Sequence, residues 1–127
     1  MPWYIEGSLR HISNVNVNKE KIDSTIADVT IRDKIYVLLH GDYDSYSKSG
    51  AATLVLMLGY KPYALVFGHM HQCGVDDASG IKLIRSGSLG GSGDEYTVEK
   101  RLYGKPSQMV CVCSDTGAKA YYPIDLE

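Results

Sequence analysis

The chain has 127 residues, of which 44% are hydrophobic, and a formal net charge of −2. This length suffices for one domain with its own core, and the hydrophobic content is that of globular rather than disordered proteins. With 13 basic against 15 acidic residues, the composition excludes a protein that binds nucleic acid by charge alone.

The first segment, residues 2–13, is predicted to form an amphipathic helix. Pro2 suits the first turn, and Trp3 and Leu9 can share an apolar face. His11 in this helix is interpreted as a residue at the edge of the core or on the surface. The segment lacks the apolar centre of a signal peptide, and no run approaches the ~20 apolar residues of a membrane span. We therefore expect a cytoplasmic protein that does not contact membranes.

Three short strands are predicted next. Val15 to Lys19 alternates valine with asparagine, and Ser24 to Ile31 alternates apolar and polar residues more fully. The polar turn at residues 32–34 leads into the apolar run Ile35 to Leu39. The second and third strands should therefore form a hairpin.

A crossover unit follows. Residues 49–58 form the predicted helix, with Ser47 or Ser49 as its N-cap and Gly59 as its stop. This helix is apolar nearly all round, so we expect it to be covered on more than one side. The run Tyr63 to Phe67 is a further strand, and strand–helix–strand order implies a parallel pair joined by a right-handed crossover.

The last third of the chain is predicted to be mostly strands and turns. The segments are a polar connection (72–80), a strand (81–85), a glycine- and serine-rich loop (86–93), a weak helix (94–103), and two strands (108–113 and 118–124) joined by a hairpin turn (114–117).

The 3 cysteines fit neither a disulfide framework nor a zinc knuckle. Cys111 and Cys113 share one face of a predicted strand, and Cys73 lies apart from them. We interpret all of them as buried free thiols in a reducing compartment.

Histidines at strand exits are the strongest chemical signal. His40 follows one strand of the crossover unit, and His69 and His71 follow the other. Because parallel neighbours end at the same edge of a sheet, the two exits should lie about 5 Å apart. Imidazole suits zinc, manganese or iron, and three histidines alone could hold one catalytic zinc, although no evident general base accompanies them. An isolated His-x-His is more often not a metal site, and the neighbouring His40 favours one here.

Two further sets of residues keep two interpretations each. Asp42 and Asp44 either orient a histidine ring from the second shell or cap loop turns. The stretch Ser86, Gly87 and Ser88 either offers backbone N–H groups to a phosphate or forms a tight structural turn.

The sequence Gly68-His69-Met70-His71 after an apolar strand resembles the GHxH signature of calcineurin-like metallophosphoesterases. His40 resembles the single-histidine motif that precedes it, and the stretch 84–89 follows the family's order of a strand and a GS-containing turn. The resemblance spans about residues 24 to 124. The start at Trp3 and the stretch from Lys105 look most like the phage-type branch.

The resemblance implies a fold, a chemistry and a ligand set. The fold would be the C-terminal half of an α/β αββα sandwich, with a βαβ unit and C-terminal antiparallel strands. The family uses two divalent metal ions (Mn, Zn or Fe) to hydrolyse phosphomonoesters or phosphodiesters, so nucleotides and nucleic acids are candidate substrates. By position, His40 and His69 would bind one metal and His71 the other.

The chain departs from the family because the Asp-x-His, GDxxD and GNH[DE] motifs are missing. We therefore expect residues 1–127 to be a single domain that lacks the N-terminal metal-binding half. Hydrolysis is expected of the full-length protein, to which this chain supplies the histidine ligands. The alternative is a non-catalytic module that binds a partner or forms a homodimer through the surface that truncation exposes.

Overall fold

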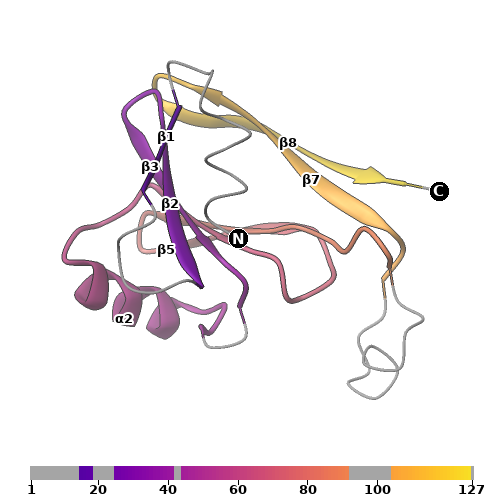
Figure 1. Ribbon diagram of the computed structural model, residues 1–127, viewed down its shortest axis with the longest axis horizontal. Coiled ribbons are helices and arrows are strands. Elements are labelled where there is room, and N and C mark those ends of the chain that lie inside the picture. Colours follow the sequence, from indigo (N-terminus) through magenta and orange to yellow (C-terminus); the bar gives the residue numbers. More distant parts are fainter. Residues whose placement is uncertain (1–14, 19–24, 42–43, 92–103, 127) are drawn as a thin grey trace.

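The computed structural model describes residues 15–18, 25–41, 44–91 and 104–126. Within these residues the chain forms three layers: a helix, a six-stranded sheet and a two-stranded sheet (Figure 1). The elements in chain order are β1 (Val15–Asn18), β2 (Ile26–Ile31), β3 (Lys34–Leu39), α2 (Lys48–Leu58), β4 (Ala64–Phe67), β5 (Gly74–Ala78), β6 (Ile81–Arg85), β7 (Ser107–Ser114) and β8 (Gly117–Asp125).

The larger sheet has the strand order β1-β2-β3-β4-β6-β5. Strands β3, β4 and β6 are parallel, whereas β1, β2 and β5 pair antiparallel with their neighbours. Leu39 pairs with Phe67, and Phe67 pairs with Arg85, so the three parallel strands end at the same edge. The predicted hairpin and the predicted parallel crossover are both confirmed.

Helix α2 is fixed at both ends by its caps. The Ser47 hydroxyl accepts a hydrogen bond from the Gly50 N–H at 3.0 Å, and Gly59 ends the helix at φ 79°. The helix buries only one face, through Ala51 and Leu54. Leu56 is 84% exposed, so the expectation that the helix is covered on more than one side is wrong. The reason is that α2 packs against the larger sheet with one of its sides, which carries Ala51 and Leu54 (Figure 1).

The core lies on both faces of the larger sheet. On the α2 side, buried residues of five strands pack on the helix; the largest buried residues of this cluster are Phe67, Leu65 and Val37 of the strands and Leu54 of the helix. On the other side, β7 and β8 cover Tyr36, Ala64 and Ile84. Because the sheet is buried on both faces, the sequences of β3 and β4 are continuous apolar runs.

Residues 72–80 are not the predicted polar connection, because β5 runs through them and pairs antiparallel with β6. Only Ala78 of this strand is buried, and Asp76 and Asp77 are exposed. Edge strands commonly carry charged residues that prevent pairing with a further strand. Here the two aspartates interrupt the apolar pattern, so the sequence did not predict a strand.

The C-terminal hairpin agrees with its prediction, with a register shift between Val112 and Cys113. The helices predicted at 2–13 and 94–103 lie outside the described residues. Among the residues that are described, no helix is long and apolar enough to cross a membrane.

Candidate functional site

The two strand exits of the crossover unit meet at His40 and His69. The His40 carbonyl accepts hydrogen bonds from the N–H groups of both Gly68 (3.2 Å) and His69 (2.7 Å). This pair of bonds continues the β3–β4 pairing beyond the last ladder partners, Leu39 and Phe67. The two imidazole centroids lie 5.3 Å apart with an interplanar angle of 63°. The proximity predicted from the parallel crossover is therefore confirmed.

Gly41 allows the two exits to approach this closely. Its φ is +108°, and a Cβ at this position would lie 2.9 Å from the His69 Cβ. A side chain here would both strain the backbone and push on the neighbouring strand exit. The glycine in the sequence His40-Gly41 thus has a steric role in placing the two histidines.

The two rings meet edge to face, so the pair brings two candidate metal ligands together. Within the described residues, however, no group of three His, Cys, Asp or Glu side chains is arranged to hold a metal. His40 and His69 are therefore the best-placed part of the candidate site.

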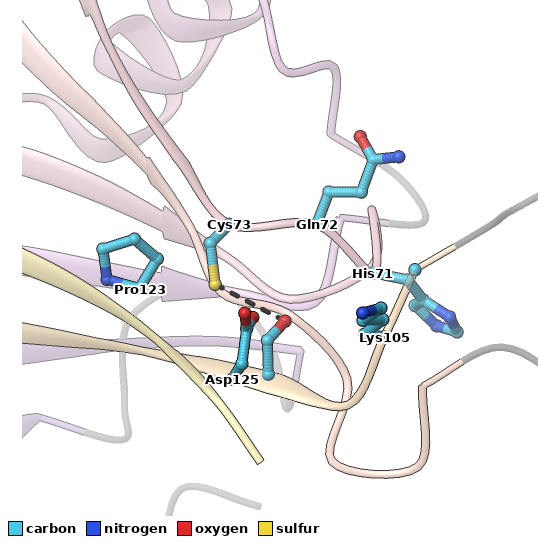
Figure 2. A pocket seen from close by; sticks show the side chains of 8 residues that line it. His71, Gln72, Cys73, Lys105, Pro123 and Asp125 are labelled. Carbon is cyan, nitrogen blue, oxygen red and sulfur yellow. Dashed lines mark hydrogen bonds between the residues drawn. The ribbon is translucent and has the colours of Figure 1, made fainter. Parts of the chain in front are cut away.

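His71 lies in a left-handed turn, with φ at 56°, and its Nδ1 is buried without a hydrogen-bond partner among the described residues. The residue lines a cavity of about 260 Å³ between the loop after β4 and the open end of the β7–β8 hairpin. The Cys73 thiol donates to the Ser107 hydroxyl at 3.7 Å, and Figure 2 shows the His71 ring lying apart from Cys73. The assignment of His71 as a ligand of a second metal stays a prediction.

Of the two candidate carboxylates, the structure describes only one. Asp42 lies outside the described residues, and Asp44 is a partly exposed residue of the loop before α2. The choice between a second-shell role and a turn-capping role stays open for both.

The glycine- and serine-rich loop after β6 makes extensive contact with β7. The Ser86 hydroxyl accepts from the Met109 N–H at 3.2 Å, and the Gly87 carbonyl accepts from the Gln108 amide at 2.9 Å. The Ser88 carbonyl accepts from the Ser107 N–H at 3.0 Å. These bonds match the structural-turn interpretation of the loop, and the phosphate-binding interpretation stays a prediction.

Sequence reasoning missed Arg85, which ends the third parallel strand at the same edge as the histidines. Its guanidinium lies 4.8 Å from the Tyr46 ring centroid, and its Nε is buried without a partner among the described residues. The single proton of the Tyr46 hydroxyl lies within donating reach of two acceptors, an Asp76 carboxylate oxygen at 2.6 Å and the Leu83 carbonyl oxygen at 3.0 Å. Burial, followed by the hydrogen bond to Asp76, raises the pKa of Tyr46 to about 12. The rule that ligands bind at the carboxyl ends of strands would have drawn attention to this arginine.

No protein-family model and no curated protein matches the sequence. Solved structures do match by fold. A single-mutant Vps29 from Entamoeba histolytica superposes with a TM-score of 0.60 at 16% identity, over 87% of this chain and 65% of that one. The wild-type Vps29 of the same organism, crystallised with Zn²⁺, gives 0.58 at 17% identity, over 80% and 61%. Vacuolar Protein Sorting 29 from Cryptosporidium parvum gives 0.54 at 15% identity, over 98% and 77%.

These likenesses concern the fold alone, because the identities are low. The chain spans less than two thirds of the length of the two Entamoeba proteins. In this chain the matched fold is a mixed parallel and antiparallel sheet followed by an antiparallel pair of strands. The described part of this chain therefore has a Vps29-like fold.

Proposed function

We propose that this chain is a non-catalytic module of the metallophosphoesterase fold that associates with a second copy of itself through the outer face of the β7–β8 hairpin. The observation that carries the proposal is the exposure of that face. Val110, Val112, Tyr122 and Ile124 are between 42% and 52% exposed.

These four residues form one surface because of the strand period. Met109, Cys111, Cys113 and Tyr121 pack inward against the larger sheet, so the residues between them point away from it. Val110 pairs with Tyr122 across the two strands. None of the four residues of this outer face is charged. Contiguous apolar surface of this kind marks interaction sites in soluble proteins.

A second copy is the partner that this chemistry favours. The four residues of this face carry no charge that would select a complementary partner, and two identical apolar faces are complementary to each other. Face-to-face sheets pack about 10 Å apart, with side chains such as these between them. The face has only four apolar side chains, each about half exposed, whereas a standard interface buries about 800 Å² per partner, so we expect a weak dimer.

Sedimentation velocity over a range of protein concentrations tests the proposal. We expect a concentration-dependent dimer that Val112→Lys and Tyr122→Lys abolish, because each buries a charge at the centre of the contact. Leu56→Lys on α2 is the matched control, since it places the same charge on an exposed leucine elsewhere and should leave the dimer intact. A monomer at all concentrations, or a dimer insensitive to both hairpin variants, would refute the proposal.

Metal-dependent hydrolysis of phosphate esters is the second candidate, as an activity of a larger protein to which this chain contributes His40 and His69. The 5.3 Å separation of their imidazoles favours it. A fold neighbour crystallised with Zn²⁺ adds support for a metal in this candidate. Membership of the phage-type branch belongs to the same hypothesis.

Calorimetric titration with Mn²⁺ and Zn²⁺ tests this second candidate on the chain as it is. Binding that His40→Ala or His69→Ala weakens at least tenfold, and that His11→Ala leaves unchanged, would support a metal half-site. Hydrolysis of bis(p-nitrophenyl) phosphate should then appear only when a polypeptide carrying the missing motifs is added. Equal affinity in all variants would exclude the histidine ligands.

A further inference from the structure

The cavity of about 260 Å³ at the open end of the β7–β8 hairpin is not used by the proposed function. Its lining residues Ser107, Pro123 and Asp125 come from the hairpin. By the strand period they share a face with Met109 and Tyr121, which pack against the larger sheet. Ser107 and Asp125 are also direct cross-strand partners. The cavity therefore lies on the inner side of the hairpin, opposite the face that we assign to the dimer.

Close packing holds the walls of this cavity in place. Ser107 is 7% exposed and lies against Gly87, where a Cβ would collide with the serine hydroxyl. The free thiol of Cys73 donates to the same hydroxyl at 3.7 Å, which joins the loop after β4 to the start of β7. Gly104 lies against the His71 carbonyl, and a Cβ there would collide with it. The cavity is therefore a preformed site, as ligand pockets usually are.

Two opposite charges line the cavity without pairing with each other. They are the Lys105 ammonium and the Asp125 carboxylate, both on exposed residues. Among the described residues, Lys82 and Asp77 form an ion pair at 3.4 Å, whereas no ion pair joins Lys105 to Asp125. Figure 2 shows the charged ends of Lys105 and Asp125 separated from each other across the cavity. Each charge can therefore bind a different group of one ligand.

We propose that this cavity binds an aliphatic α-amino acid as its zwitterion, with the ligand carboxylate at Lys105 and the ligand ammonium at Asp125. A ligand with one charge would meet one favourable and one unfavourable partner, whereas a zwitterion satisfies both. Pro123 and Cys73 offer apolar surface to an aliphatic side chain. The size agrees, because a cavity of about 150 Å³ holds one benzene molecule and 260 Å³ has room for a single amino acid.

The two charges together make other occupants less suitable. Lys105 would repel a metal ion, and no three His, Cys, Asp or Glu side chains in the described part of the chain are grouped to hold one. Asp125 would repel a phosphate or another anion in the same way. Binding of the zwitterion, by contrast, forms charge-assisted hydrogen bonds at both ends and requires neither a covalent step nor a change of protonation.

Saturation-transfer NMR on the full chain tests the site with three probes of similar shape. L-Leucine carries both charges, isocaproate lacks the ammonium group, and isoamylamine lacks the carboxylate. The dissociation constant of each probe follows from a ligand titration. We expect leucine to bind, and each analogue to bind about tenfold more weakly, the usual effect of a lost hydrogen bond to a charged group.

Two variants of the cavity should change the preference among the probes as well as the affinity. Lys105→Gln and Asp125→Asn should each weaken leucine binding about tenfold. Lys105→Gln should no longer favour leucine over isoamylamine, and Asp125→Asn should no longer favour leucine over isocaproate. Lys119→Gln and Asp115→Asn are the matched controls, because they remove the same charges from exposed hairpin positions outside the cavity lining, and they should leave leucine binding unchanged.

The absence of leucine binding at millimolar concentration would overturn the proposal, and so would equal binding of the three probes. Unchanged preferences in both cavity variants, or an equal loss in the control variants, would overturn the assignment to Lys105 and Asp125. The proposed dimer is measured by sedimentation and uses the opposite face of the hairpin, so the two proposals stand or fail separately.

Discussion

Replacing Gly41 with alanine should separate backbone strain from the steric role of this glycine between the two histidines. Gly59→Ala is the matched control, because Gly59 also has a positive φ (79°) but a Cβ there meets nothing within 4 Å. The control should cost about 1 kcal/mol of unfolding free energy from left-handed strain alone.

Gly41→Ala adds a steric cost to a backbone strain at least as large as that of Gly59→Ala, because the φ of +108° at Gly41 lies further outside the left-handed region than the 79° at Gly59. The new Cβ would lie 2.9 Å from the His69 Cβ, and the 2.7 Å bond from the His69 N–H to the His40 carbonyl restrains that residue from moving. Overpacking of this kind costs about 1–3 kcal/mol, so the total should reach about 2–4 kcal/mol. Any metal affinity that depends on the His40–His69 pair should fall in this variant and not in the control.

Urea unfolding followed by circular dichroism measures both effects, since the midpoint falls in proportion to the lost free energy while the slope stays constant. If Gly41→Ala loses no more than Gly59→Ala, the close approach of the strand exits does not depend on this glycine. The steric argument would then be refuted.

Three further predictions use the same assay. Tyr60→Phe removes the 2.7 Å hydrogen bond from the Tyr60 hydroxyl to Asp28, a residue only 5% exposed. The loss should lower the unfolding free energy by about 1–3 kcal/mol. No change in the unfolding free energy would mean that other groups satisfy this carboxylate. Gly74→Ala places a Cβ against the Arg85 guanidinium and should drive it off the Tyr46 ring, at a cost of about 1 kcal/mol. That cost should disappear in an Arg85→Ala background, and its persistence there would contradict the assigned clash. Finally, since folding raises the pKa of Tyr46 from 10.0 to about 12, its contribution to stability should be complete below pH 10 and lost as the pH rises towards 12; Tyr46→Phe should flatten this alkaline decline.

Burial on two faces decided which parts of the fold could be predicted from the sequence. Strands β3 and β4 are covered by α2 on one side and by the hairpin on the other, so they are apolar throughout and were recognised, together with the histidines that follow them. Strand β5 lies at an edge and buries only Ala78, so its alternation was too weak to detect.

The candidate site was predictable only where it followed from strand order. His40 and His69 come together because parallel strands share an edge, and a crossover helix with clear caps identified the parallel pair. Arg85 ends a strand in the same register, but a single cation after an apolar run carries no motif. Helix α2 was predicted wrongly for the opposite reason: its apolar residues suggested burial on more than one side. Composition does not reveal which face of a helix lacks a covering layer.

The attachment of the hairpin to the larger sheet has a consequence for the order in which the protein assembles during synthesis. The β7–β8 turn is local, but the bond from the Ala118 N–H to the Tyr63 hydroxyl joins residues 55 positions apart, and the Gln108 amide reaches back 21 positions to Gly87. Because the strands of the larger sheet leave the ribosome first, their hairpin-facing surface waits uncovered until the last strands emerge. We therefore expect the ribosome-bound chain to be most prone to misassembly just before residue 107, and chaperone contact to end once the hairpin has docked.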